Sequence, residues 1–265
     1  MIKTKNDIAW EKLFAKYNIL SEIEDKGFFQ ITAMAINEFR EARLATKFDH
    51  KRNLPELFKN NRLSILPITR GSYIISSFEA YKNLNEINTE IIKMPFPEYI
   101  ESIDYENITS EAIAINCAFV SGILLDFLET DKLFPTVSGR MGSDEFSFYI
   151  NNLNMNKEIE VMVSNSQIEV DGGYEGEDSL ALIEAKNSIS DDFLIRQLYY
   201  PFRLWDSRIK KTIRPIFMVY SNGIFTLYEY NFQEPYNYNS LILLKQKNYT
   251  LEQDFISLDE ILPRL

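Results

Sequence analysis

Two runs of residues that are typical of β-strands lie close together in the middle of the chain. The first ends at Asp171, just before a Gly-Gly pair, and the second, Leu-Ala-Leu-Ile-Glu-Ala-Lys, contains Glu184 and Lys186. Successive side chains of a strand point to opposite faces, so Glu184 and Lys186 point the same way. If the two strands pair, Asp171 can reach the same face. We therefore expect two carboxylates and a lysine together at the end of a strand.

Two carboxylates beside a lysine suit a hard cation with a phosphate or a water molecule next to it. A solvated strand face with a cross-strand ion pair would carry the same residues. Three features favour a functional site. Apolar residues flank Glu184, as in a central strand. The glycines after Asp171 would let the backbone approach a phosphate closely. A long amphipathic helix is predicted from Asp191, with Arg196, Gln197 and Arg203 on it.

Composition excludes several classes of protein. The 265 residues are 45% hydrophobic and 25% charged, which is typical of a soluble globular protein with one or two domains. The single cysteine, Cys117, excludes a disulfide framework and a Cys-based zinc site within the chain. The single histidine, His50, is too few for HNH or phospholipase-D-type nucleases, and we expect it on a solvent-facing loop. No P-loop or dinucleotide-binding glycine motif occurs.

Localisation signals are also missing from the sequence. The start is polar, so no signal peptide is predicted, and we expect a cytoplasmic protein. The most apolar stretch, Ala112 to Leu128, contains Asn116, Ser121 and Asp126. It is too short and too polar to cross a bilayer, and it predicts a buried helix.

Charge is distributed unevenly along the chain. The net charge is −11, which argues against nonspecific nucleic-acid binding over the whole surface but allows a local basic cleft. Residues 1–80 contain 13 Lys and Arg against 10 Asp and Glu, whereas the remainder contains 15 against 29. The N-terminal part is thus slightly basic and the rest strongly acidic. Basic residues that only solvate helices would explain this difference equally well.

The periodicity of apolar residues divides the chain into three parts. Residues 1–80 predict short helices, among them one over Ala33–Arg43, followed by a hairpin with a turn at Thr69-Arg70-Gly71. This order suggests a winged-helix-like DNA-binding domain. Residues 81–107 are predicted to form an irregular connector. Residues 108–265 begin with the buried helix, and the glycine-rich stretch 135–143 is predicted to be a loop.

In this third part, strands are predicted at Glu145–Ile150, Glu158–Val163 and Gln167–Asp171, the last two forming one bent hairpin. A strand at Ser179–Lys186, a helix at Asp191–Arg208 and a strand at Pro215–Tyr220 follow. Asp191 and Asp192 suit the positive N-terminal end of that helix. We expect an α/β fold with a mixed sheet and the order helix, three strands, helix, strand.

The segment around Asp171, Glu184 and Lys186 resembles the active-site core of the PD-(D/E)xK nuclease superfamily. The chain as a whole resembles a type II restriction endonuclease. Gln197 is a weaker match to a glutamine that some members carry on the following helix. The proline of the motif is absent, and Val170 precedes Asp171. The resemblance covers roughly residues 108 to 222, and the predicted order agrees with the αβββαβ core of that superfamily.

The resemblance implies Mg²⁺-dependent, sequence-specific hydrolysis of double-stranded DNA that leaves 5′-phosphate ends, with Mn²⁺ as a substitute metal. Asp171 and Glu184 would bind the metal, and the carbonyl of Ala185 is a further expected ligand. Lys186 would orient or help deprotonate the attacking water and offset phosphate charge. A palindromic recognition site would imply a homodimer, because two-fold symmetry in DNA mirrors two-fold symmetry in protein.

Several further residues are weaker candidates. Glu169 and Glu111 would be auxiliary acids, although a solvated strand residue and an ordinary helix-start glutamate are the simpler interpretations. The candidates for DNA binding are basic residues on predicted helices and on the glycine-rich loop: Arg40, Arg43, Lys47, Arg140, Arg196 and Arg203. Two alternatives stay open. One is a repair or phage-defence nuclease of the same fold, and the other is a noncatalytic winged-helix regulator that binds DNA.

Overall fold

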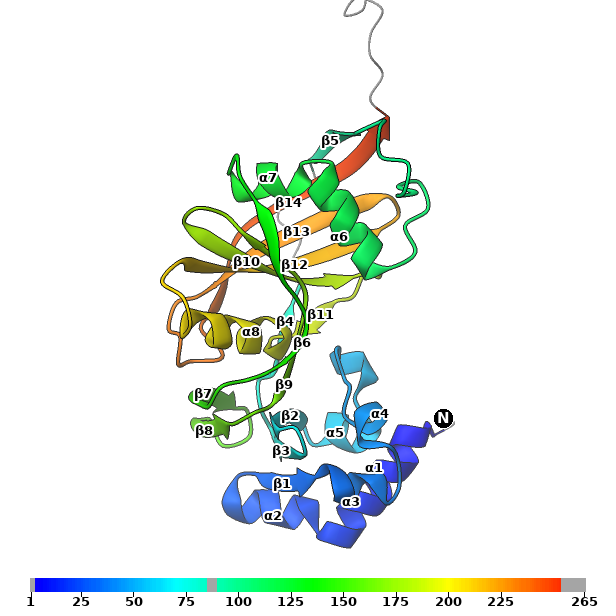
Figure 1. The fold of residues 1–265 in the computed structure, drawn as a ribbon. Coiled ribbons are helices and arrows are strands. Elements are labelled where there is room, and N and C mark those ends of the chain that lie inside the picture. Colours follow the sequence, from blue (N-terminus) through cyan, green and yellow to red (C-terminus); the bar gives the residue numbers. More distant parts are fainter. Residues whose placement is uncertain (1–2, 85–89, 254–265) are drawn as a thin grey trace, which may run out of the picture.

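The computed structural model describes residues 3–84 and 90–253, and Figure 1 shows their arrangement. Within these ranges the strands form one seven-stranded sheet, one three-stranded sheet and two pairs of strands. Short helices accompany them. The predicted mixed α/β class is therefore confirmed. No helix in the described ranges has the length and apolar character needed to span a membrane.

The N-terminal part combines short helices with the three-stranded sheet, whose order is β1-β3-β2. Its elements are α1 (Lys5–Tyr17), α2 (Ile19–Lys26), β1 (Phe29–Thr32), α3 (Ala33–Asn37), α4 (Ala42–Ala45), the 3₁₀ helix η1 (Lys51–Asn53), α5 (Glu56–Asn60), β2 (Ser64–Thr69) and β3 (Ser72–Ser76). Thr4 and Asp7 form a capping box at the start of α1. Gly27, with φ of 87°, ends α2.

The helix predicted over Ala33–Arg43 is two helices. The side-chain oxygen of Asn37 accepts a hydrogen bond from the N–H of Ala42 at 2.7 Å, so it satisfies a donor at the start of α4. An asparagine side chain that binds nearby backbone competes with continuation of a helix. The chain therefore turns between α3 and α4.

The second part is built on the seven-stranded sheet, in the order β5-β14-β13-β12-β10-β9-β6. Its strands are β5 (Ile91–Phe96), β6 (Phe134–Gly142), β9 (Gln167–Glu175), β10 (Ser179–Lys186), β12 (Thr212–Ser221), β13 (Ile224–Phe232) and β14 (Leu241–Gln253). The helices are α6 (Glu111–Val120), α7 (Ile123–Leu128) and α8 (Arg196–Asp206). Two short pairs complete it: β4 (Tyr81–Asn83) with β11 (Asp192–Leu194), and β7 (Phe146–Asn152) with β8 (Lys157–Val163).

Strand β10 is central in this sheet. It pairs antiparallel with β9 on one side and parallel with β12 on the other, and α8 makes the crossover between β10 and β12. Both of its faces are covered (Figure 1), by α8 on one side and by α6 and α7 on the other. Leu182 belongs to the core on the α8 side, whereas Ile183 and Ala185 belong to the core on the α6 side. Alternation then places Glu184 and Lys186 on the α8 side.

A β-bulge interrupts the pairing of β9 with β6. Gly139 pairs with Val170 and Val137 pairs with Gly173, so one residue of β6 lies opposite the two residues Asp171 and Gly172 of β9. A bulge bends its strand and redirects the side chains next to it. Asp171 therefore sits at an irregularity of the sheet, directly beside the pairing of Gly172 with Ile183 of β10.

One hydrophobic core joins the N-terminal part to the α8 face of the large sheet. It runs without interruption from Trp10 of α1 to Tyr238, which precedes β14. Hydrogen bonds cross the same seam: the hydroxyl of Tyr200 on α8 donates to the carbonyl of Pro67 on β2 at 2.8 Å. The two parts are thus packed as one body.

Several element predictions in the second part are wrong. The irregular connector 81–107 contains β4 and β5. The stretch 135–143 lies almost wholly in β6, an edge strand, rather than in a loop. The predicted buried helix is broken at Gly122, where φ is 80°. The helix expected from Asp191 begins at Arg196, because β11 occupies residues 192–194 and pairs with β4.

The strands predicted at Glu145–Ile150 and Glu158–Val163 exist, but they pair with each other outside the large sheet as β7 and β8. The hairpin predicted between Glu158–Val163 and Gln167–Asp171 is therefore absent from the described pairings. The predicted strand at Ser179–Lys186 has the bounds of β10.

The close approach of β6 to β9 yields a stability test at Gly173. A methyl group there would lie 2.6 Å from Cβ of Val137 and 3.0 Å from its carbonyl oxygen, so backbone has to move. Overpacking of this kind costs about 1–3 kcal/mol, and we expect Gly173→Ala to lower the free energy of unfolding by that amount. Gly71→Ala is the matched control, since nothing lies within 4 Å of the added methyl. Urea denaturation of both variants measures the difference; equal stabilities would contradict the packing.

Candidate functional site

Three of the predicted residues meet at the ends of β9 and β10. The N–H of Ala185 donates a hydrogen bond to Oδ2 of Asp171 at 2.9 Å, which ties the first carboxylate to the residue next to Glu184. Nζ of Lys186 donates to Oε1 of Glu184. The cross-strand pairing and the alternation along β10 therefore bring Asp171, Glu184 and Lys186 together as expected from the sequence.

Gln197 completes this group from α8. Its Nε2 donates to the same Oε1 of Glu184 that receives Lys186. Its own Oε1 is buried and has no hydrogen-bond partner. A buried amide oxygen without a partner is costly, and it is available to a water or an ion. Gln197 therefore binds Glu184 through its amide nitrogen, and its amide oxygen keeps its bonding capacity.

Glu184 is almost completely buried, with 7% of its surface exposed. Burial raises the pKa of its carboxyl group to about 7. Lys186 opposes this shift by attraction and by its hydrogen bond, whereas Asp171 and Asp49 increase it by repulsion. Glu184 therefore lies in a place where a negative charge is poorly compensated, which is favourable for a bound cation.

Burial and the neighbouring carboxylates act on the pKa of Lys186 in opposite directions. Burial alone would lower the pKa of its ammonium group, but attraction to Glu184, with smaller contributions from Asp49 and Glu111, outweighs that effect and raises it. Lys186 is therefore a buried cation held among carboxylates. In this state it neutralises part of the negative charge of the centre.

Glu111, a predicted auxiliary acid, lies close enough to interact with this group. It stands in the first turn of α6. Burial raises the pKa of Glu111, and Asp171 adds to the increase while Lys186 opposes it. Glu169, the other auxiliary candidate, has its carboxylate 3.1 Å from Nε of Arg140 across the β6–β9 pair, with both side chains about half exposed.

The predicted DNA-binding residues fall into different places. Arg140 is exposed on β6 rather than on a loop. Arg196 begins α8 and stacks over the ring of Tyr200. Arg203 is buried: its guanidinium donates to the carbonyl of Ser147 at 2.8 Å and stacks on aromatic rings, including Tyr236. Arg203 therefore has a structural role, and we no longer include it among the DNA contacts.

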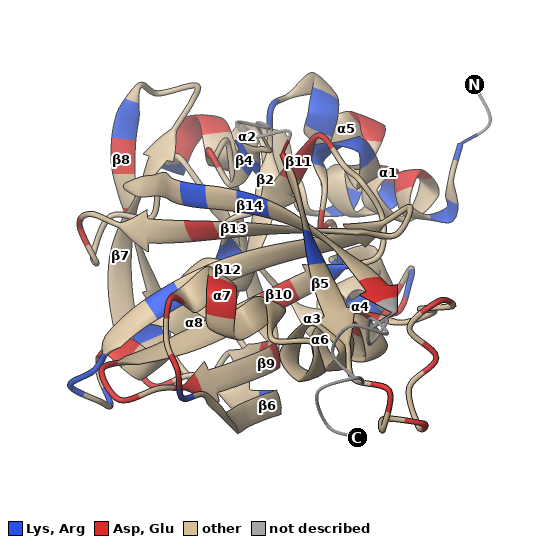
Figure 2. Cartoon of the chain, turned by 90° about the horizontal axis from the view of Figure 1, so that it is seen from above, with Lys and Arg blue, Asp and Glu red and all other residues tan. Residues whose placement is uncertain are grey.

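In the N-terminal part, Arg43 is exposed on α4, and Arg40 lies between α3 and α4 with its Nε buried and unpaired. Lys47 is 71% exposed in its side chain. Basic residues are interspersed with acidic ones over the face of the molecule in Figure 2 rather than gathered on one element. The predicted local basic cleft stays a prediction.

His50 was expected on a solvent-facing loop, and this expectation is wrong. The side chain is 7% exposed. Its Nδ1 lies 2.5 Å from the carbonyl oxygen of Asp192 and 2.9 Å from Oγ of Ser190. The partners are about 140 residues away in sequence, so no local pattern around His50 predicts this burial.

The donor set fits a hard divalent cation. Asp171 and Glu184 supply carboxylate oxygens and Gln197 an orphaned amide oxygen, and oxygen donors without His or Cys are the preference of Mg²⁺ and Mn²⁺. Within the described ranges, no three His, Cys, Asp or Glu side chains form a metal-binding group. A site made from two carboxylates, a backbone carbonyl and waters would not require a third.

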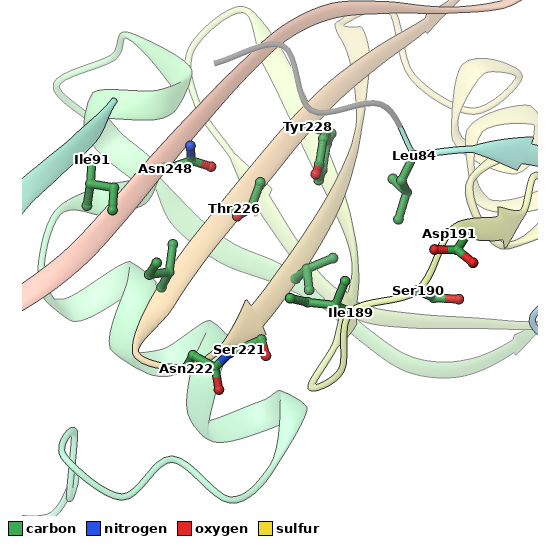
Figure 3. A pocket seen from close by; sticks show the side chains of 12 residues that line it. Leu84, Ile91, Ile189, Ser190, Asp191, Ser221, Asn222, Thr226, Tyr228 and Asn248 are labelled. Atoms are coloured by element: carbon green, nitrogen blue, oxygen red, sulfur yellow. The ribbon is translucent and has the colours of Figure 1, made fainter. Parts of the chain in front are cut away.

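A separate cavity of about 390 Å³ lies on the α8 side of the large sheet, the side to which Glu184 and Lys186 also point (Figure 3). Val219, one of its lining residues, is the strand partner of Lys186. Ser190 and Asp191 form part of its wall, and Thr226 and Asn222 contribute polar groups from β13 and the β12–β13 turn. The segment that follows Lys186 therefore lines this cavity.

The raised pKa of Glu184 predicts a pH dependence of stability. Since the pKa rises from 4.5 to about 7 on folding, the folded state favours the protonated acid. Ionisation of Glu184 therefore lowers the free energy of unfolding. This loss is absent below pH 4.5, grows as the pH rises, and is complete above about 7, where it reaches about 3 kcal/mol. Glu184→Gln removes it. Between pH 5 and 8 in EDTA, we expect urea denaturation to show wild-type stability falling relative to Glu184→Gln; parallel curves would contradict this.

Comparison with known proteins places the chain in a family without assigning its chemistry. No curated protein and no solved structure matches it. Residues 7–75 match a domain of unknown function, DUF6996, and residues 76–250 match a second one, DUF6997. The boundary between the two matches falls at the end of β3. Because the second match covers more than half of the sequence, the chain belongs to the family of the domain of unknown function DUF6997.

Proposed function

We propose that this protein is a Mg²⁺-dependent endonuclease that hydrolyses phosphodiester bonds of double-stranded DNA, in the manner of a type II restriction enzyme. The observation that carries the proposal is the meeting of Asp171, Glu184 and Lys186 through the β9–β10 pairing. Gln197 joins them from the helix that follows. This is the set of residues and roles that the PD-(D/E)xK resemblance implies.

The order of the surrounding elements also supports the proposal. Helix α6 precedes strands β6, β9 and β10, which lie side by side, and α8 then leads to β12 parallel to β10. This order, with α7, β7, β8 and β11 as additional elements, is consistent with the αβββαβ core expected of the superfamily. In the N-terminal part, β1 pairs with β3 of the β2–β3 hairpin, and helices α3 to α5 lie between β1 and β2. Such an order is consistent with a winged-helix DNA-binding domain.

In the proposed mechanism, Asp171, Glu184 and the Ala185 carbonyl would hold the cation, which supplies Lewis-acid stabilisation of phosphate charge and a more acidic bound water. Oε1 of Glu184 already receives hydrogen bonds from Lys186 and Gln197. A cation would therefore bind the other oxygen of Glu184 or displace one of these two donors. Lys186 holds a proton at Nζ beside the carboxylates and offsets the charge that develops on the phosphate. Gln197 orients the carboxylate of Glu184 through its amide.

An endonuclease is favoured over a noncatalytic regulator because of Glu184. A DNA-binding protein that acts only through its winged helix gains nothing from a buried acid with an unfavourable pKa. Restriction, repair and phage defence would use the same centre. Cleavage of a palindromic site would require a homodimer, whereas a repair or defence enzyme need not recognise such a site. Incubating a sequenced plasmid with the protein and mapping the new ends distinguishes these roles.

Removal of each centre residue tests the assignment. We expect Asp171→Ala, Glu184→Ala and Lys186→Ala each to reduce Mg²⁺-dependent plasmid cleavage by at least about 100-fold, because each removes a group that acts on the phosphate or its cation. Circular dichroism should show that the variants stay folded. Exposed Glu234→Ala, on the segment after β13, is the control and should cleave like the wild type. Wild-type rates in any of the three variants would contradict the assignment.

The metal is tested separately. Carboxylate and amide oxygens predict activity with Mg²⁺ or Mn²⁺, and Ca²⁺ should support DNA binding without turnover. Excess EDTA should stop plasmid cleavage and added Mg²⁺ should restore it, as followed by gel electrophoresis. Full activity in EDTA would rule out this mechanism.

A further inference from the structure

Residues 47–51 of the N-terminal part dock on strand β11, which follows the strand that carries Lys186 and precedes the helix that carries Gln197. The N–H of Leu194 donates to the carbonyl of Asp49 at 3.1 Å. The N–H of Lys51 lies 3.2 Å from Oδ1 of Asp192, and buried His50 contacts the carbonyl of the same residue. The 47–51 segment is therefore fixed by backbone and buried side-chain contacts to strand β11.

The partner strand of β11 holds the same segment. The hydroxyl of Tyr81 donates to the carbonyl of Phe48 at 2.8 Å, and Nζ of Lys51 donates to Oδ1 of Asn83 at 3.2 Å. Tyr81 and Asn83 both belong to β4, which pairs with β11. Contacts from two strands leave the backbone of the 47–51 segment little freedom, so the segment carries Lys47 and Asp49 at a fixed place on the surface.

Strand β11 lies in the sequence between Lys186, at the end of β10, and Gln197, at the start of α8. A segment docked on β11 is thus attached to the link between these two residues. Glu111, at the start of α6, interacts electrostatically with Lys47 and Asp49 of the segment as well as with Lys186 and Asp171 of the centre.

The two lysines near the carboxylates differ in accessibility. Lys186 is 13% exposed and occupied by Glu184. Lys47 is 71% exposed, and its Nζ lies 3.8 Å from Oδ2 of Asp49, beyond a normal hydrogen bond. An ion pair at this separation with an exposed lysine is weak, so the ammonium group is free to exchange Asp49 for a phosphate.

We propose that Lys47 is a further phosphate-binding residue of the catalytic centre, supplied by the N-terminal part, and that Asp49 is a positioning residue for it. The ligand class is a phosphodiester whose phosphate lies between the exposed Lys47 and the buried Lys186. This inference rests on the proposed nuclease function. It moves Lys47 from a general DNA-binding role to the site of cleavage.

Cleavage and affinity must be measured apart. The variants are Lys47→Gln, Lys47→Arg and Asp49→Asn, with Lys26→Gln as the control, since Lys26 is an exposed, carboxylate-paired lysine on α2, far from β10 in Figure 1. The probe is supercoiled plasmid DNA. The rate is measured with Mg²⁺ at saturating protein in a single turnover, and the dissociation constant is measured with Ca²⁺.

We expect Lys47→Gln to lower the single-turnover rate by about 100-fold, as removal of a donor to a developing charge does, and to change the dissociation constant by less than about tenfold. Lys47→Arg should recover most of the rate because it keeps the charge. Asp49→Asn should lower the rate less than Lys47→Gln. Lys26→Gln should match the wild type in both measurements.

Two results would overturn the inference while leaving the nuclease in place. One is a Lys47→Gln rate equal to that of Lys26→Gln. The other is a loss confined to affinity, with the wild-type rate at saturation, which would make Lys47 an ordinary backbone contact. Failure of the wild type to cleave plasmid DNA in Mg²⁺ would instead overturn the proposed function, and the inference with it.

Discussion

A cross-strand hydrogen bond, from the N–H of Ala185 to the carboxylate of Asp171, sets the geometry on which the rest of the centre depends. It joins two strands that run in opposite directions, at the point where a bulge in β9 turns Asp171 out of the regular pleat. Without the bulge, pairing with β6 would continue undisturbed past Asp171. The bulge in the pairing of β9 with the edge strand β6 therefore helps to place Asp171 beside the central strand β10.

Around this bond the chain accepts an unfavourable electrostatic arrangement. A buried carboxylic acid costs free energy unless it is paired and hydrogen-bonded. Glu184 receives two donors, yet burial still raises its pKa. Local conflict of this kind, within a strand whose other buried residues are apolar, is expected where a site is kept for binding rather than for stability. The buried, unpartnered amide oxygen of Gln197 supports the same interpretation.

Local patterns predicted what is locally determined. Strand β10 has its predicted bounds because an apolar run and flanking polar residues define it, and Gly27 ends α2 because it adopts φ of 87°. The three residues of the centre were predicted from the two-residue period of side chains along a strand, together with a family resemblance. Asp171 lies close to the other two residues because β9 and β10 are consecutive strands in the sequence and pair with each other.

Features that depend on tertiary contacts were missed. Strand β6 contains a proline and two glycines, which are typical of loops, but as an edge strand it tolerates them. Asp192 looked like a helix-start acid, yet it accepts from Lys51 of the N-terminal part. His50 and Asp49 carry no local signal for their positions, because their partners lie about 140 residues later in the chain. Only the folded chain brings these residues together.

The continuous core between the two parts has a consequence for how such proteins can diversify. Enzymes assembled from independent modules exchange a recognition domain by recombination at a linker. Here a join at residue 76 would cut through the core that extends from Trp10 to Tyr238 and separate Tyr200 from Pro67. A transplanted N-terminal part would also bring its own version of the 47–51 segment against a foreign β11. New specificity in this architecture would therefore arise by substitution on exposed surfaces, with both halves inherited together.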